Sequence, residues 1–148
     1  MRVAPFLKFD ANATYLDAEY KEYSSILANR TVADFSGNTM PRAPKWSLTS
    51  SATIDNIKLG ESAEASLRVE YNHRGKTYFT RENTAVGSQG GLNLINAFAA
   101  IKFDDGAWEL RASGRNLTNK RFFNFLRNDP FATVGEFRTF EVSALLRF

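Results

Sequence analysis

The sequence predicts an all-β fold, an antiparallel up-and-down meander of about six strands. Three observations lead to this prediction. Apolar residues recur at every second position in six segments, the connections between the segments alternate between long and short, and the short connections are rich in turn formers. Because side chains alternate across a strand, a spacing of two gives each strand one apolar face and one polar face.

The six segments keep their apolar residues in a single register. Counted at every second residue, this apolar register runs over 7–15, 46–54, 65–71, 95–103, 108–114 and 140–148. It contains no charged residue, and Ser50 is its only clearly polar member. All strand charges fall on the other face, where we expect Lys8, Asp10, Arg68, Glu70, Arg111 and Arg115 to line a lumen.

The connections predict which ends of the strands lie together. The long ones cover roughly residues 18–44, 72–93 and 116–138, whereas residues 56–62 and 104–107 form tight turns. All long loops therefore lie on one side, with the segments 20–39, 80–91 and 126–134 expected to be the most mobile. This asymmetry is typical of outer-membrane barrels, and a soluble meander does not require it.

Aromatic residues of the apolar register gather at the two ends of the strands. Tyr15, Trp46, Tyr71 and Phe140 fall near the long loops, whereas Phe9, Phe103, Trp108 and Phe148 fall toward the short turns. Aromatic rings favour both interfaces of a membrane, so two belts around an apolar band indicate lipid on that face. The sequence therefore predicts a partial transmembrane β-barrel. The plainer interpretation is that aromatic residues are good strand formers.

Composition and motifs offer little catalytic chemistry, so we expect no enzyme, no cofactor and no metal site. The chain has no cysteine and a single histidine, His73, which reads as a surface residue. The glycine-rich run at 87–91 lacks the Lys-Ser/Thr of a phosphate-binding loop, and Asp104 and Asp105 are expected to form a turn. A net charge of +3, scattered along the chain, does not indicate nucleic-acid binding.

Four segments together resemble the end of the TonB-dependent outer-membrane receptors. Residues 114–122 (GRNLTNKRF) are similar to a signature near the end of that family, with Asn119 and Phe122 in place of Asp and Tyr. The segments 138–148, 37–46 and 15–20 resemble other family motifs, in family order and at similar spacing. The family-motif residues carried over are Asn116, Leu117, Thr118 and Asn119.

The resemblance implies a receptor in the outer membrane of a Gram-negative bacterium that takes up ferric siderophores or similar scarce ligands. Such receptors enclose a plug in a barrel of about 22 strands. Because the match covers only the end of that barrel, we expect residues 1–148 to be its C-terminal segment, without the plug domain. The implied partners are outer-membrane lipid, the barrel-assembly machinery, the remaining strands and plug, and TonB through a missing N-terminal part.

The last segment matches a closing strand of such a barrel. The residues expected to serve membrane insertion are Phe140, Val142, Ala144, Leu146 and Phe148. Six strands leave two open edges, so we do not expect the segment to insert or act alone. The alternative is a soluble all-β ligand-binding module, a lipocalin-like barrel or a sandwich, in which the apolar register packs a core.

The two interpretations differ in where the apolar register points. In a receptor it lies on the convex, exposed face of one sheet, whereas in a soluble module it is buried in a closed interior. The residues chosen for this comparison are Leu7, Phe9, Trp46, Leu48, Leu67, Val69, Ile101, Leu110, Val142 and Leu146.

Overall fold

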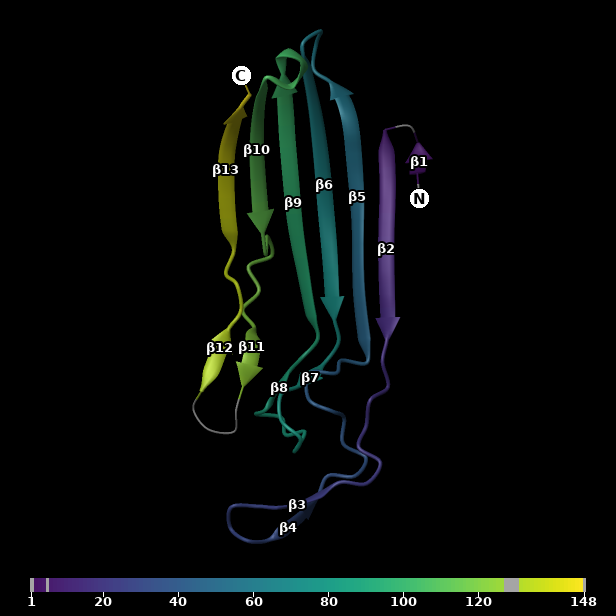
Figure 1. Cartoon of the computed structure of the whole chain (residues 1–148), viewed down its shortest axis with the longest axis vertical. Coiled ribbons are helices and arrows are strands. Elements are labelled where there is room, and N and C mark those ends of the chain that lie inside the picture. The colour runs from purple at the N-terminus through teal and green to yellow at the C-terminus, as the bar shows by residue number, and fades with distance from the viewer. Residues whose placement is uncertain (1, 5, 127–130, 148) are drawn as a thin grey trace.

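One antiparallel sheet dominates the computed structural model, which describes residues 2–4, 6–126 and 131–147 (Figure 1). Its seven strands follow the order β1-β2-β5-β6-β9-β10-β13. Their bounds are β1 Arg2–Ala4, β2 Leu7–Tyr15, β5 Trp46–Lys58, β6 Ala63–Arg74, β9 Leu92–Phe103, β10 Trp108–Arg115 and β13 Thr139–Leu146. Each strand pairs with its neighbours along the chain, apart from small hairpins, so the predicted meander of six long strands is confirmed.

Tight turns join the strands at one end of the sheet, at the top of Figure 1. The β9–β10 turn is a short 3-10 helix, η1 (Asp104–Gly106), in which Asp104 and Gly106 have φ of 49° and 93°. The β5–β6 turn is tighter than the sequence suggested, because β5 continues to Lys58. A bulge between Ile54 and Ile57, with Asn56 at φ 57°, shifts the register of this extension.

The three long connections all leave the opposite end of the sheet, as predicted (Figure 1). Each contains a small two-stranded hairpin that the alternation did not reveal. These are β3 (Ser24–Ile26) with β4 (Val32–Asp34), β7 (Thr77–Tyr78) with β8 (Ser88–Gln89), and β11 (Phe123–Leu126) with β12 (Ala132–Val134). The mobility expected of the three loops stays a prediction, and residues 127–130 of the third lie outside the described residues.

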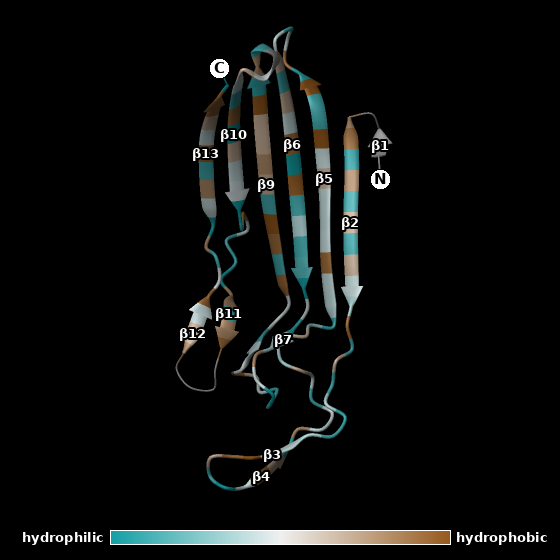
Figure 2. Cartoon of the chain, in the orientation of Figure 1, coloured by the Kyte–Doolittle hydropathy of each residue, from teal (hydrophilic) through white to brown (hydrophobic). Residues whose placement is uncertain are grey.

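Cross-strand pairing carries the apolar register across the whole sheet. Ala52 lies opposite Phe9 and Val69, and the same row continues through Ala97 and Gly114 to Phe140. Residues directly opposite each other share a face of the sheet, so six strands present one continuous apolar face. Figure 2 shows the resulting alternation of apolar and polar bands along the strands.

This apolar face is exposed. The ten residues chosen from the sequence all lie in the apolar register and none is buried, with Trp46 55% and Val142 71% exposed. Among the described residues the buried large hydrophobic side chains are Phe35, Phe79, Leu92 and Phe122, which lie in the long connections or at the loop-side end of β9. The soluble alternative is therefore not supported, because its core would have to be formed by the apolar register.

The opposite face is concave. A hollow of about 470 Å³ is lined by residues of five adjacent strands, among them Asp55, Arg68, Phe98, Arg111 and Glu141. These residues belong to the polar register, so this hollow opens on the polar face. In the described part of the chain, no helix is long and apolar enough to cross a membrane.

Candidate functional site

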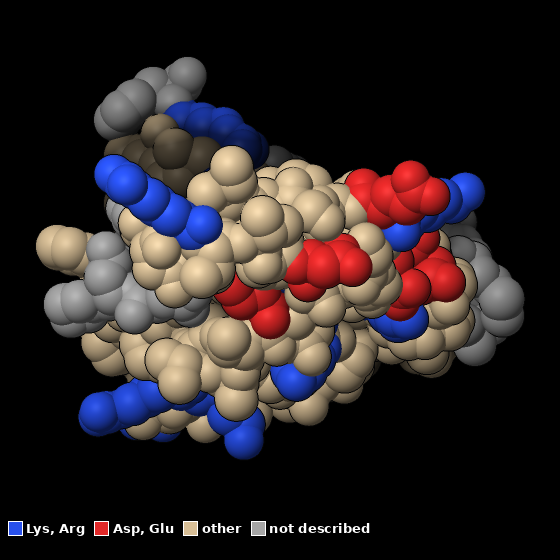
Figure 3. Space-filling view, turned by 90° about the horizontal axis from the view of Figure 1, so that it is seen from below, with Lys and Arg blue, Asp and Glu red and all other residues tan. Residues whose placement is uncertain are grey.

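The candidate site is the loop-side end of the concave face with the three long connections around it, which we call the mouth. The connections are the first loop (residues 16–45), the second loop (75–91) and the third loop (116–138). Figure 3 looks onto this end and shows acidic and basic side chains interspersed over it. Neither sign of charge forms a continuous patch in this view.

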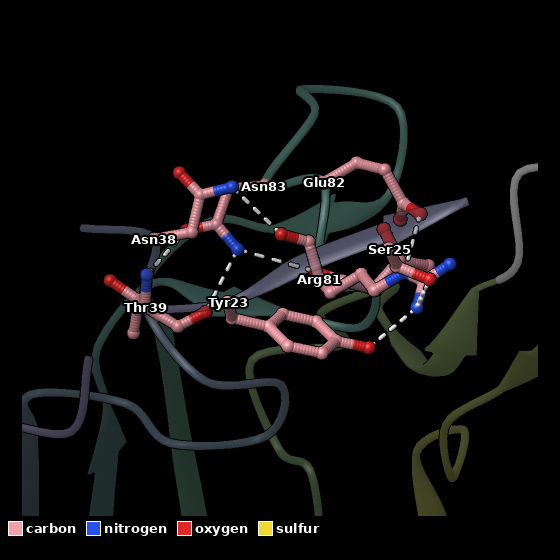
Figure 4. Close-up of polar contacts among 8 residues, drawn as sticks. Tyr23, Ser25, Asn38, Thr39, Arg81, Glu82 and Asn83 are labelled. Carbon is pink, nitrogen blue, oxygen red and sulfur yellow. Dashed lines mark hydrogen bonds and ion pairs between the residues drawn. The ribbon is translucent and has the colours of Figure 1, made fainter. Parts of the chain in front are cut away.

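Arg81 of the second loop fastens that loop to the first (Figure 4). Its Nη1 donates to the hydroxyl of Tyr23 at 2.6 Å and to Ser25 Oγ at 3.2 Å. Its guanidinium also lies over the rings of Tyr23 and Phe35, with Cζ 5.7 and 4.9 Å from the centroids. The hydrogen bond to Tyr23 raises the pKa of Arg81 above its ordinary value, so the group stays charged.

A second contact between the same loops uses amide side chains. Asn83 Oδ1 accepts from the backbone N of Thr39 at 2.8 Å, and its Nδ2 donates to the Thr39 carbonyl at 2.9 Å. Asn38 Nδ2 donates to the carbonyl of Arg81 at 2.8 Å. The amide of Asn83 thus pairs with the backbone of Thr39 in the manner of a neighbouring strand. We call these two sets of contacts the loop clamp.

The first loop is also fixed by local charge contacts. Lys45 Nζ lies 3.1 Å from both Asp17 Oδ1 and Glu19 Oε1, and these partners raise the pKa of Lys45. Where β4 ends, the Oγ and backbone N of Ser36 donate to Asp34 at 2.6 and 2.9 Å, which lowers the pKa of Asp34. Sequence analysis identified none of these contacts. Partners as far apart as Tyr23 and Arg81 leave no local signal, whereas the Asp34–Ser36 contact is local and was missed.

Asn116 forms the base of the third loop. It is 2% exposed, and its Nδ2 donates to the carbonyls of Lys120 and Glu136 at 2.8 and 2.9 Å. Its Oδ1 accepts from the backbone N of Lys120 at 2.9 Å, and its own backbone N donates to Asn96 Oδ1 at 2.9 Å. With φ at 48°, the position also suits asparagine conformationally.

The other three motif residues complete the same turn. The backbone N of Leu117 donates to the carbonyl of Ile95 at 2.8 Å, and that of Asn119 donates to Asn116 at 2.8 Å. Thr118 is exposed. The structure therefore brings the four family-motif residues together in one turn that joins β10, β9 and the third loop.

Two glycines allow close packing around this turn. A Cβ at Gly114 would lie 2.6 Å from Leu117 Cδ2, and one at Gly135 would overlap the ring of Phe122. The third loop can therefore lie against β10 and fold its Phe122 inward only where these positions lack a side chain.

The strand predicted to serve membrane insertion is β13 at the edge of the sheet. Phe140, Val142, Ala144 and Leu146 lie on the convex face, opposite Gly114, Ala112, Leu110 and Trp108 of β10. All four are exposed, and Phe148 lies outside the described residues. At the loop-side end of the convex face, the rings of Tyr15 and Trp46 contact each other, with their centroids 4.9 Å apart. Phe103 lies opposite Trp108 at the turn-side end.

Ion pairs line the concave face away from the mouth. Lys8 lies 3.0 Å from Asp10 and Arg68 lies 2.8 Å from Glu70. Arg111 binds both carboxylate oxygens of Glu109, at 2.8 and 2.9 Å. These pairs include Lys8, Asp10, Arg68, Glu70 and Arg111, which the sequence assigned to the lumen face together with Arg115.

A small depression at the mouth has a mixed polar and apolar lining, in contrast to the ion pairs of the concave face. It measures about 340 Å³ and is lined by Asn72, His73, Arg74, Leu92, Leu94, Phe122, Asn124 and Glu136. Arg74 is the last residue of β6, and its Nε and Nη2 are buried without a hydrogen-bond partner among the described residues. The depression thus combines a cation, amides, an aromatic ring and aliphatic groups.

The described residues hold no group of three or more His, Asp or Glu side chains placed to bind a metal ion. His73 belongs to β6 and not to the following loop, and its Nδ1 lies 2.6 Å from Asn93 Oδ1. The hydroxyl of Tyr71 donates to the same oxygen at 2.8 Å. Tyr71, His73 and Asn93 thus form a polar cluster on the convex face, at the loop-side end of the apolar residues.

Comparison with known proteins identifies relatives of this architecture. Residues 3–117 match the family described as TonB dependent receptor-like, beta-barrel. The siderophore receptor PiuA of Acinetobacter baumannii is 24% identical, with a TM-score of 0.76 over 97% of this chain and 20% of its own. The ferric yersiniabactin uptake receptor FyuA of Yersinia pestis is 18% identical, with a TM-score of 0.74 over 99% and 22%.

A third solved structure, the ferric preacinetobactin receptor BauA of Acinetobacter baumannii, is 24% identical and has a TM-score of 0.73. The chain spans about a fifth of the length of these three receptors. The comparison with curated protein sequences gives no match. The family consists of receptors and transporters of the Gram-negative outer membrane and is not an enzyme family. Since the family model covers most of the chain, this chain belongs to the family of TonB-dependent receptor β-barrels.

Proposed function

We propose that this chain is the C-terminal barrel segment of an outer-membrane receptor that takes up a ferric siderophore or a similarly scarce ligand. The observation that carries the proposal is the continuous apolar register on the convex, exposed face of six paired strands. Lipid is the solvent that such a face requires, because exposure to water would leave it unstable. Membership of the receptor family supports the same conclusion.

The polarity of the sheet assigns the two sides of the membrane. In barrels of this kind the short turns lie in the periplasm and the long loops outside the cell. The mouth then faces the medium, and the concave polar face lines the lumen. A ligand would meet the three loops first and pass along this face.

The remaining partners follow from the open edges of the sheet. Within the described residues, β13 pairs only with β10, and β2 pairs on its other side with the three residues of β1. Unpaired backbone groups are costly in hydrocarbon, so further barrel strands must complete both edges. We therefore propose that the segment works only with the other strands and plug of a complete receptor. The barrel-assembly machinery inserts it, and TonB acts through the N-terminal part.

The proposal is tested by uptake in a strain in which the gene for the complete receptor has been deleted. Cells starved of iron are supplied with radioactive iron as one of several ferric siderophores, and accumulation is measured with and without the receptor. We expect loss of uptake for at least one of them, and the same loss when TonB is inactivated. Uptake of every complex at the parental rate in the deletion strain would refute the assignment to ferric siderophores.

A further inference from the structure

Arg74 differs from the cations of the concave face that form ion pairs. Lys8, Arg68 and Arg111 each lie within about 3 Å of a carboxylate oxygen. For Arg74, two of the three guanidinium nitrogens are shielded from solvent and donate to nothing in the described part of the chain. Glu136 lines the same depression, yet it forms no ion pair with Arg74.

The two nitrogens of Arg74 that lack a partner are arranged to donate in parallel. Nε and Nη2 form one edge of the guanidinium plane, and their N–H bonds point in nearly the same direction. This edge matches a pair of oxygens such as those of a carboxylate, which it binds through two parallel hydrogen bonds. A buried donor without a hydrogen-bond partner costs desolvation free energy. Two such donors side by side therefore indicate that a binding partner satisfies them in the working receptor.

The surroundings favour a small molecule as that partner. The depression has a volume of about 340 Å³, at the lower end of the range of roughly 300–1,000 Å³ for ligand sites. Phe122, Leu92 and Leu94 provide an apolar lining, and Asn72 and Asn124 provide amides. A few polar groups in an apolar pocket are typical of sites that recognise small ligands.

Its place in the fold gives access from the medium. Arg74 ends β6 at the loop side, where it lies opposite Ser47 and Leu92. Phe122 and Asn124 come from the third loop, which the Asn116 turn holds at its base. The donor edge is shielded in this structure, so side chains around it must shift before an anion can reach it.

We propose that Arg74 is the anion anchor of the mouth: its Nε and Nη2 bind two negatively charged oxygens of the transported ligand. The inference rests on the proposed uptake function and narrows its substrate class. The ligand is an anionic ferric chelate, with carboxylate or catecholate oxygens, and not a cationic hydroxamate complex. The same pair of oxygens could come from a carboxylate elsewhere in the complete receptor, and the experiment separates the two sources.

The test measures binding of radioactive iron complexes at 4 °C to cells that carry the complete receptor. The probes are ferric citrate, a ferric catecholate (ferric enterobactin) and a cationic ferric hydroxamate (ferrioxamine B). The variants are Arg74→Gln and Arg74→Lys, and the matched control is Arg121→Gln, an exposed arginine of the third loop outside the depression. Heat-modifiable migration on gels reports the amount of folded barrel for each.

We expect the unmodified receptor to bind at least one anionic complex. Arg74→Gln should weaken that binding about tenfold to hundredfold, the range for losing charge-assisted hydrogen bonds. Arg74→Lys keeps the charge without the two-pronged edge and should also weaken binding, whereas Arg121→Gln should stay within about twofold. If one Arg74 variant does not fold, the other still decides the question.

Three results would overturn the proposal. Unchanged binding of the anionic complex by a folded Arg74 variant would leave the uptake function intact but remove Arg74 from it. A fall in the amount or heat stability of the folded barrel, with unchanged ligand affinity, would assign the donor edge to a carboxylate of the receptor. Binding of the cationic complex alone would contradict the substrate class. Binding of none of the three would contradict the uptake of these iron complexes as well.

Discussion

Replacing Ala112 by arginine should lower the amount of folded barrel, whereas the same replacement at the neighbouring Ser113 should be tolerated. The two small residues are adjacent on β10 and so lie at the same depth. Ala112 is opposite Ala99 and Val142 on the convex face, and Ser113 is opposite Phe98 and Glu141 on the concave face. The comparison therefore isolates the solvent that each face meets.

The register gives the depth of Ala112 and hence the size of the effect. From Ile95 to Phe103 of β9, about eight steps of about 3.4 Å span about 27 Å. A tilt of about 40° reduces this to about 21 Å, which lies within an apolar band of about 25 Å. Ala99, the partner of Ala112, lies at the midpoint of that span. Arginine near the midplane costs about 2–4 kcal/mol, which changes a folding equilibrium about thirty-fold to several-hundred-fold.

The assay is refolding of the complete receptor into lipid vesicles at graded urea concentrations, followed by heat-modifiable migration. For Ala112→Arg we expect a folding midpoint at lower urea than for the parent receptor. Ser113→Arg should keep the parental midpoint, because that face meets water or protein and Glu141 lies opposite. Equal midpoints for the two arginine variants would mean that both faces see the same solvent, and the membrane assignment would have to be abandoned.

Three further predictions concern the loops. Asn116→Ala should destabilise the third loop by about 1–3 kcal/mol, because it leaves buried backbone groups unpaired, and faster protease cleavage there than in the exposed control Thr118→Ala would report it. Arg81→Ala should open the loop clamp, so that hydrogen exchange increases in the first and second loops together; a change confined to the second loop would contradict the clamp. The pKa of Asp34 is lowered by the hydrogen bonds from Ser36, so its contribution to the stability of the turn after β4 is complete above the ordinary aspartate pKa and is lost as the pH falls through the lowered value. Exchange of the Ser36 amide should therefore accelerate in acid beyond its intrinsic rate, and Asp34→Asn should remove that pH dependence.

The long strands could be predicted from the sequence because their information is local. Alternation at every second residue decides which face each side chain takes, whatever lies beyond the strand. The bounds of β2 and β10 follow the alternation closely, and the long and short connections gave the polarity of the sheet. The strands predicted for β5 and β6 were shorter than the observed ones. A bulge at Asn56 and polar residues such as His73 interrupt the alternation without ending the strand.

The mouth could not be predicted in the same way. The Arg81–Tyr23 contact joins residues 58 positions apart, and its geometry depends on how two irregular loops meet. The sequence already separates Arg74 from Arg68, because Arg68 has Glu70 two residues along on the same face, whereas the corresponding neighbours of Arg74 are Asn72 and Lys76. That two of its guanidinium nitrogens are buried appears only in the fold. Asn116 is an intermediate case, since the motif singled it out whereas its hydrogen bonds appear only in the folded loop.

The most direct test of the central claim is a scan of solvent along one strand. This chain has no cysteine, so single cysteines introduced at residues 95–103 of β9 can each carry a spin label in a complete receptor from which any other cysteine has been removed. Collision rates with oxygen, which concentrates in lipid, and with a water-soluble nickel chelate are then compared in vesicles. We predict a period of two, with odd positions from Ile95 to Phe103 favouring oxygen and even positions from Asn96 to Lys102 favouring the chelate or neither. A scan without this period, or with the two registers exchanged, would contradict the account.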